Sequence, residues 1–366
     1  MEGLSGYFKC FMQKYKVLPV LASVSCFLLA FAATAENWQW HAVNTVGSWS
    51  HGSSYSVISS SGASCPFASV ESVDGVSYGG FIYPYDRRVA GVKNDFDGDG
   101  KSDCWYFHVP SQVWYVIYSS ATQTVSRVSF GLTDAVPVPE DYDGDHQADF
   151  AVYQESSGTW VALLSSLDYA SASAVFGGPG YNPVPADFDG DQKADPAVYN
   201  QGAGTWSAMQ SANGYAPISG GFGGQGYVAL AGDFDEDDKA DPWVYNETAG
   251  ALSIAMSGSG YLSVSGGYGG PGFSLVSDDY DGDGCADAAA YERESGLWYV
   301  MNYKLDRLIW GLKWGGAGYL PLTGDYDGDG LADASVFYRD LRNSTWYLNE
   351  STDGPQTISA RGDRQR

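Results

Sequence analysis

The stretch Asp325-Tyr326-Asp327-Gly328-Asp329-Gly330-Leu331-Ala332-Asp333 decides the fold of this chain. The same nine-residue frame begins at Asp95 and returns every 46 residues, at Asp141, Asp187, Asp233, Asp279 and Asp325. In every copy, aspartates occupy frame positions one, three, five and nine. Four aspartates in each of six copies make 24 of the 44 acidic residues, a spacing that a merely solvated acidic surface does not produce.

Aspartates alternating with small residues predict a calcium site in each loop. Ca²⁺ takes six to eight oxygen ligands at about 2.3–2.6 Å, and a loop of this kind turns several carboxylates onto one point. The frame begins like an EF-hand loop, but its closing acid comes at position nine rather than twelve. Glycine at position six permits a sharp turn in copies one, five and six. His146, Gln192 and Asp238 stand there in copies two to four, which predicts weaker or more strained sites.

The predicted ligands form six sets, and up to six structural Ca²⁺ ions are expected. Position seven contributes through its backbone carbonyl in every set. The sets are Asp95, Asp97, Asp99, Lys101 and Asp103; Asp141, Asp143, Asp145, Gln147 and Asp149; Asp187, Asp189, Asp191, Lys193 and Asp195; Asp233, Asp235, Asp237, Lys239 and Asp241; Asp279, Asp281, Asp283, Cys285 and Asp287; and Asp325, Asp327, Asp329, Leu331 and Asp333.

The 46-residue unit is predicted to be four antiparallel strands. In the second copy, strand-like runs cover 136–139, 150–153, 159–164 and 173–178, with the aspartate loop between the first two. The runs are short, rich in β-branched and aromatic residues, and bounded by Gly, Pro and Ser. Four strands in about 40–50 residues are typical of a propeller blade, so we expect an all-β propeller.

Aromatic residues recur with the same period and have two interpretations. Tryptophans follow the turn in the middle of the unit, and tyrosines share one position on the strand before it. Residues repeated in every blade usually pack sheet against sheet, so we favour a core role over sugar stacking. The residues are Trp114, Trp160, Trp206, Trp298, Trp346, Tyr153, Tyr199, Tyr245 and Tyr291.

The number of blades depends on residues 37–88. One period before Asp95 lies Trp49, where the frame 49–57 keeps Gly52 but loses all four aspartates. We interpret 37–88 as a degenerate first blade without calcium, which with the six repeats in 89–362 predicts seven blades in one domain, 36–366. The alternative is six blades preceded by an N-terminal cap.

The N-terminus predicts secretion. Three lysines precede an apolar run over 17–33, and Ala33-Thr34-Ala35 suits cleavage, so residues 1–35 are expected to be a signal peptide. The alternative is an uncleaved membrane anchor. After cleavage we expect a secreted, cell-surface or periplasmic protein that inserts into no membrane. Of the three remaining cysteines, Cys65 and Cys104 are predicted to pair and Cys285 to stay free.

In these loops the chain resembles the FG-GAP, or VCBS-type, repeat family, which includes the N-terminal propellers of integrin α subunits. The match is the Asp-x-Asp-x-Asp-Gly-x-x-Asp loop together with Phe130-Gly131, 176–180 and 222–224. The resemblance implies a propeller whose loop calcium ions are structural and lie away from the ligand face. It covers 89–350 strongly and 37–88 only by extrapolation. Six loops and no stalk domain depart from the integrin pattern, which leaves an integrin-like partner in doubt.

Two classes of function are consistent with these observations. The first is a non-catalytic adhesion or interaction module that binds an extracellular protein or a glycan, as a lectin does. The alternative is a carbohydrate-active lyase or hydrolase on a propeller scaffold. The chain has four histidines and no recognisable triad or zinc motif, which favours the first class. A net charge of −25 excludes nucleic acid as a partner.

Overall fold

The computed structural model describes residues 59–60, 63–64, 70–72, 75–79, 93–121, 125–339 and 343–361. Apart from the short 3-10 helices η1 (Ser165–Leu167) and η2 (Ser257–Ser259), the regular elements of these residues are strands. None of the helices in these ranges is long and apolar enough to cross a membrane. The predicted signal peptide lies outside the described residues.

Six antiparallel sheets form the part of residues 38–366 that the structure describes, beside the small hairpin of β1 (Ser59–Ser60) and β2 (Ala63–Ser64). Blade one has β3 (Val70–Ser72), β4 (Gly75–Gly79), β5 (Cys104–His108), β6 (Val113–Ile117) and β7 (Val125–Ser129). Blade two has β8 (Val136–Pro137), β9 (Phe150–Gln154), β10 (Thr159–Leu164) and β11 (Ala170–Val175). Blade three has β12 (Tyr181–Pro183), β13 (Ala197–Asn200), β14 (Thr205–Gln210) and β15 (Ala216–Gly221).

Blades four to six repeat this order of four strands. Blade four has β16 (Val228–Gly232), β17 (Asp241–Asn246), β18 (Ala251–Met256) and β19 (Leu262–Gly267). Blade five has β20 (Phe273–Asp278), β21 (Asp287–Glu292), β22 (Leu297–Met301) and β23 (Arg307–Lys313). Blade six has β24 (Leu320–Leu322), β25 (Ser335–Arg339), β26 (Asn343–Glu350) and β27 (Gly354–Arg361). The four-stranded blade predicted from the sequence is confirmed.

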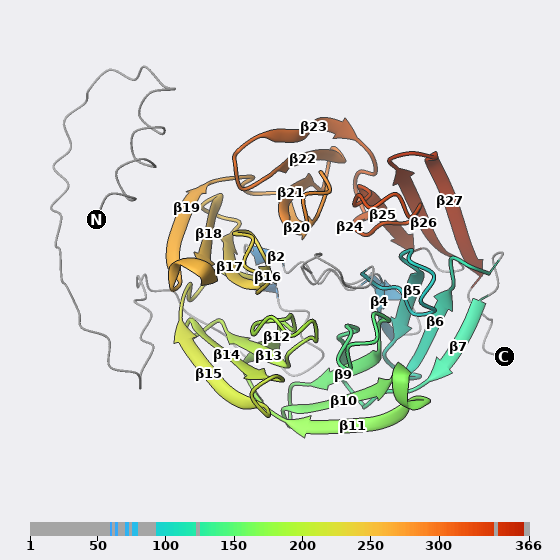
Figure 1. The fold of residues 1–366 in the computed structure, drawn as a ribbon. Coiled ribbons are helices and arrows are strands. Elements are labelled where there is room, and N and C mark those ends of the chain that lie inside the picture. Colours follow the sequence, from blue (N-terminus) through green and yellow to red (C-terminus); the bar gives the residue numbers. More distant parts are fainter. Residues whose placement is uncertain are drawn as a thin grey trace, which may run out of the picture. The chain divides into compact units, whose positions relative to one another are not determined.

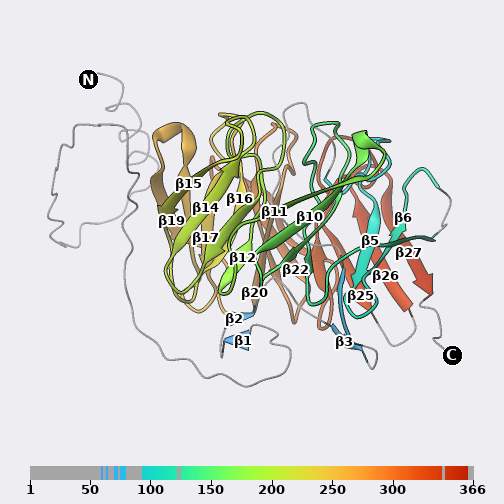
Figure 2. The same cartoon turned by 90° about the horizontal axis from the view of Figure 1, so that it is seen from below.

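The blades stand around a ring, each with its first strand towards the centre and its last strand outside (Figure 1). Seen from the side, the strands run between two rims of loops (Figure 2). Each aspartate loop is bonded to the loop of the preceding blade, because the position-eight N–H donates to the position-one carbonyl oxygen. Ala148 N lies 2.6 Å from Asp95 O, and the series closes where Ser102 N of blade one donates to Asp325 O of blade six at 2.7 Å. The ring therefore has six blades.

The predicted seventh blade is wrong. β4, from the segment expected to form that blade, pairs with β5 through Tyr78 and Phe107 and joins blade one on the inner side of β5, with β3 beyond it. Across the closure, the ring of Tyr106 in blade one lies 6.2 Å from that of Trp346 in blade six. Blades six and one thus pack directly against each other, so no blade fits between them. Most of 37–88 lies outside the described residues.

The disulfide prediction is also wrong for its described member. Cys104 is buried as a thiol between blades six and one, and Cys285 is likewise buried and in no disulfide. Cys65 lies outside the described residues. Packing in the seam between the two blades, rather than a covalent link, holds Cys104 in place.

The recurring aromatics are buried, which confirms their core role. Tyr153 pairs with Trp160 across β9 and β10, with ring centroids 4.8 Å apart. The Tyr153 hydroxyl accepts a hydrogen bond from Gly178 N at 2.9 Å, and equivalent Tyr–Gly bonds recur in blades three to five. Gly177 has φ +86°, and a Cβ there would lie 2.8 Å from the Tyr153 hydroxyl. The Phe-Gly-Gly motif thus gives this tyrosine both the space for its hydroxyl and an N–H donor.

Candidate metal loops and a candidate ligand pocket

Each aspartate loop is organised by the carboxylate at position one. In loop one, Asp95 Oδ1 accepts from Gly98 N at 2.6 Å, and Asp95 Oδ2 accepts from Gly100 N at 2.8 Å. Asp99 Oδ1 accepts from Lys101 N at 3.0 Å. The other five loops repeat these bonds from positions four and six, so one fold serves all six copies.

The aspartate at position nine ties the loop to the rest of the blade. Asp103 Oδ2 accepts from Phe96 N at 2.8 Å, and its Oδ1 accepts from Ser119 N at 2.7 Å. The Ser119 hydroxyl also donates to Asp99 Oδ1 at 2.7 Å. In loops two, three, four and six a serine likewise donates its N–H to the position-nine aspartate and its hydroxyl to the position-five aspartate. Sequence analysis missed these serines, although Ser119, Ser165, Ser211 and Ser257 follow the same 46-residue period.

One carboxylate oxygen at position three has no hydrogen-bond partner in loops one to four. These buried atoms are Oδ1 of Asp97, Asp143, Asp189 and Asp235. Ligand atoms of each of these aspartates lie within 4.8 Å of those of two further aspartates in the same loop. Two ligands of one Ca²⁺ ion are at most about 5 Å apart, given Ca–O distances of about 2.3–2.6 Å. The residues present therefore fit a hard cation bound by oxygen.

The electrostatics of the loops also favour a cation. Burial, with a smaller contribution from the charges of neighbouring loop aspartates, raises the pKa of Asp103 to about 8 and that of Asp149 to about 7. The position-nine aspartates of the other four loops have pKa values raised to about 7 or 8, again mainly by burial. A bound divalent cation would compensate the charges that burial disfavours.

The side chain at position seven contacts the loop of the preceding blade. A Cβ at Gly98 would lie 3.0 Å from the Gln147 side chain, and one at Gly144 would lie 3.0 Å from that of Lys193. Lys101 completes the ring, because its Nζ donates to Asp327 O at 2.7 Å. These contacts explain the glycine at position four in five of the copies. The role of the position-seven carbonyls as ligands stays a prediction.

Loop five differs at the hairpin that covers it. Tyr303 replaces the serine of the other copies, and the buried Asp287 Oδ1 has no hydrogen-bond partner. Lys304 Nζ instead donates to Asp283 Oδ2 at 3.1 Å and lies 3.8 Å from Glu236 of loop four. A lysine ammonium so close to a predicted ligand opposes a second cation. We therefore expect loop five to bind calcium more weakly than its neighbours.

Position six has a left-handed backbone in all six loops, as predicted. Gly100 has φ +84° and Gln192 has φ +69°. No atom lies within 4 Å of a Cβ built on Gly100, so a side chain there meets strain but no clash. In calcium-saturated protein, Gly100→Gln should lower the free energy of unfolding by about 1 kcal/mol, and Gln192→Gly should raise it by about 1 kcal/mol. Urea unfolding measures both; changes of the same sign would contradict the explanation by strain.

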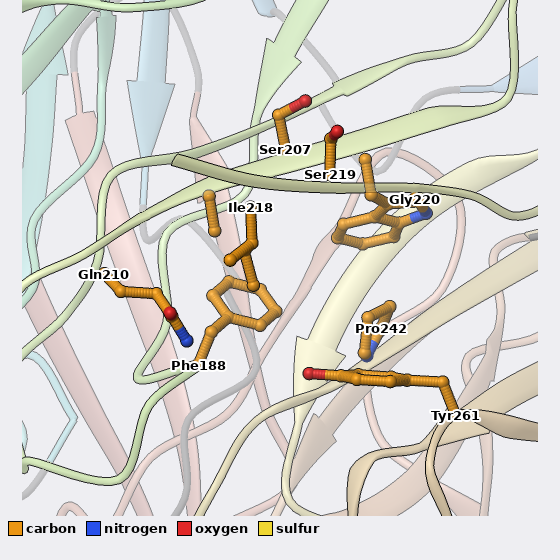
Figure 3. A pocket seen from close by; sticks show the side chains of 10 residues that line it. Phe188, Ser207, Gln210, Ile218, Ser219, Gly220, Pro242 and Tyr261 are labelled. Atoms are coloured by element: carbon orange, nitrogen blue, oxygen red, sulfur yellow. The ribbon is translucent and has the colours of Figure 1, made fainter. Parts of the chain in front are cut away.

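A pocket of about 200 Å³ opens between blades three and four (Figure 3). Phe188, Ile218, Pro242 and Tyr261 are among the side chains that give it mainly apolar walls. Ser207 and Ser219 face each other across β14 and β15 and lie side by side at its edge, and Gln210 adds an amide. Such a combination of apolar walls and few polar groups is typical of ligand sites.

The residue that faces Trp206 in the pocket differs from those that face the equivalent tryptophans of other blades. Trp206 faces Gly220 across the strands, whereas the equivalent tryptophans of blades one, two and five face Val128, Ala174 and Leu312. Those three tryptophans donate Nε1–H to a backbone carbonyl oxygen at 3.0–3.1 Å, whereas the buried Nε1 atoms of Trp206 and of Trp346 in blade six have no partner. The absent side chain at Gly220 leaves space beside the indole. The sequence did not single out this pocket, because Gly266 stands at the equivalent position of blade four.

No protein-family model and no curated protein matches the chain. Among solved structures, it is similar to virginiamycin B lyase from Staphylococcus aureus, with TM-score 0.46 and 10% identity over 77% of this chain and 86% of that one. It is also similar to BBS1N in complex with ARL6DN, with TM-score 0.44 and 12% identity over 75% of this chain and 87% of that one. At these identities the likeness concerns the fold and says nothing about activity.

Proposed function

We propose that this chain is a secreted, calcium-stabilised propeller of the FG-GAP or VCBS type that binds an extracellular protein or glycan and catalyses no reaction. The observation that carries the calcium part is the set of buried, unpartnered oxygens at position three of loops one to four. Calcium in those loops would have a structural role, because the loops join neighbouring blades. The resemblance in the sequence supports the same role.

The pocket between blades three and four supports a binding role. Its ten lining residues include three aromatic side chains, one of them a tyrosine with its phenol hydroxyl, two serine hydroxyls and one amide, but no carboxylate, imidazole or thiol that would act as acid, base or nucleophile. Aromatic faces beside hydroxyl and amide groups suit the apolar face and the hydroxyls of a sugar ring. The pocket is therefore where we place a glycan ligand.

The pocket is tested by a glycan array probed with the calcium-saturated protein and a matched pair of variants. Ser207→Trp should fill the pocket and weaken binding of any captured glycan at least about tenfold, the equivalent of about 1.4 kcal/mol. Ser253→Trp makes the same change at the equivalent position of blade four and should leave binding intact. Equal binding by both variants, or an array without any bound glycan, would contradict the glycan form of the proposal.

A further inference from the structure

The pocket between blades three and four has walls that adjoin two of the aspartate loops. Phe188 is position two of loop three, and Pro242 directly follows position nine of loop four. Gln210 precedes Ser211, whose N–H donates to the position-nine aspartate of loop three at 2.7 Å. Tyr261 ends the hairpin that covers loop four. The shape of the pocket therefore depends on the conformation of these loops.

The hairpin over loop four is hydrogen-bonded to three of its aspartates. Ser257 N donates to Asp241 Oδ1 at 2.6 Å, and Ser257 Oγ donates to Asp237 Oδ1 at 2.8 Å. Gly258 N donates to Asp235 Oδ2 at 3.1 Å. This last contact is tight, because a Cβ on Gly258 would lie 3.1 Å from the same oxygen. The place of the hairpin is thus set by the carboxylates of the loop.

Tyr261 connects this hairpin to the pocket. Its N–H donates to Met256 O at 2.7 Å, and its φ of +64° is a conformation that a tyrosine keeps only where surrounding contacts hold it. Its side chain packs against the core of blade three and is half-buried, whereas the equivalent Tyr169 and Tyr215 are 44% and 49% exposed. Together with Pro242, Tyr261 forms the wall that blade four gives to the pocket (Figure 3).

Asp235 joins the predicted calcium site to this wall. Its Oδ2 accepts from Gly258 of the hairpin, while its buried Oδ1 has no hydrogen-bond partner and is left for a cation. Without a cation, repulsion among the carboxylates of the loop favours their moving apart. The hairpin would move with them, and Tyr261 would lose its place on blade three. A filled loop would hold the wall, and an empty loop would release it.

We propose that calcium in loop four controls the pocket, so that a glycan binds tightly only when this loop is filled. This inference rests on the proposed function, which supplies both the calcium and the glycan, and it adds the regulation of the same pocket. Coupling between two sites is reciprocal. A bound glycan should therefore raise the calcium affinity of loop four by the factor by which calcium raises the affinity for the glycan.

Matched variants of single loops test the coupling in the calcium-saturated full chain, because chelation acts on all six loops at once. Asp235→Asn and Asp97→Asn remove the predicted position-three ligand from loops four and one, whose blades lie opposite each other in the ring (Figure 1). Asp235→Asn should weaken binding of a glycan captured on the array at least about tenfold, within the usual range of coupling between sites. Asp97→Asn should leave the affinity within about twofold of wild type.

Hydrogen exchange of the same proteins without sugar provides a second measurement. The amides of Ser257, Gly258 and Tyr261 are all hydrogen-bonded within the hairpin or to loop four. In Asp235→Asn, the peptide 256–262 should exchange at least about tenfold faster than in wild type, because local opening is easier. In Asp97→Asn the same peptide should keep its wild-type rate.

Ser257→Ala tests the coupling if Asp235→Asn does not fold. It keeps every predicted calcium ligand and removes one hydroxyl donor to loop four, and Ser119→Ala makes the same change at loop one. Ser257→Ala should weaken glycan binding at least about threefold, as the loss of one hydrogen bond would. Equal affinities of the loop-four and loop-one variants would overturn the coupling and leave the proposed function standing. If the array captures no glycan, the glycan part of the proposed function fails, and equal exchange of 256–262 in both variants would then overturn control by loop four as well.

Discussion

Removing calcium with EDTA should unfold this protein or lower its melting temperature by tens of degrees. A ligand present at a hundred times its Kd stabilises the folded state by about 2.7 kcal/mol per site. Six such sites contribute roughly 16 kcal/mol, which matches or exceeds the whole stability of a typical domain, about 5–15 kcal/mol. Without the ions, four neighbouring carboxylates per loop repel one another, and those at position nine stay buried.

Thermal melts followed by circular dichroism, with EDTA and after calcium is restored, measure this effect. Asp189→Asn removes one predicted ligand from loop three and should lower the number of bound calcium ions by one. Asp306→Asn changes an exposed aspartate outside the loops and is the matched control. Identical melts with and without calcium would refute the role assigned to the loops.

The sequence was sufficient to predict the blade and its core, because both depend on local periodicity. The 46-residue spacing placed each aspartate loop between the first two strands, and Tyr153 and Trp160 are buried partners as expected. The closure of the ring could not be predicted in the same way. In blades two to six the innermost strand directly precedes the loop, but in blade one β4 ends 16 residues before Asp95. β4 lies outside the 46-residue spacing, so the period of the repeat does not predict it.

The candidate ligand pocket depends on contacts between blades, which no single repeat contains. Gly220 leaves room beside Trp206 only because Pro242 and Tyr261 of the next blade form the opposite wall. The repeated aromatics pack the core and are therefore poor guides to a ligand site.

The second large effect concerns the N-terminal segment. Deleting residues 36–88 should give an insoluble or molten product even with saturating calcium, because the deletion removes β3 and β4. Without β4, the inner edge of β5 loses its pairing with Ser77, Tyr78 and Gly79. An unpaired inner edge exposes backbone groups and neighbouring apolar side chains, which favours aggregation.

A second truncation isolates the contribution of this hairpin. Deleting residues 36–69 leaves β3 and β4 in the chain and is the matched control. Solubility, size-exclusion chromatography and thermal melts are measured for both proteins. They compare a chain in which β5 keeps its partner β4 with a chain in which β4 is missing. The longer deletion should be the more damaging of the two, since Tyr106, which packs on Trp346 across the closing seam, lies on the strand that loses its partner. If the chain without 36–88 stays monomeric and melts as cooperatively as the full-length protein, β4 does not complete blade one, and the ring closes through the β5 edge without it.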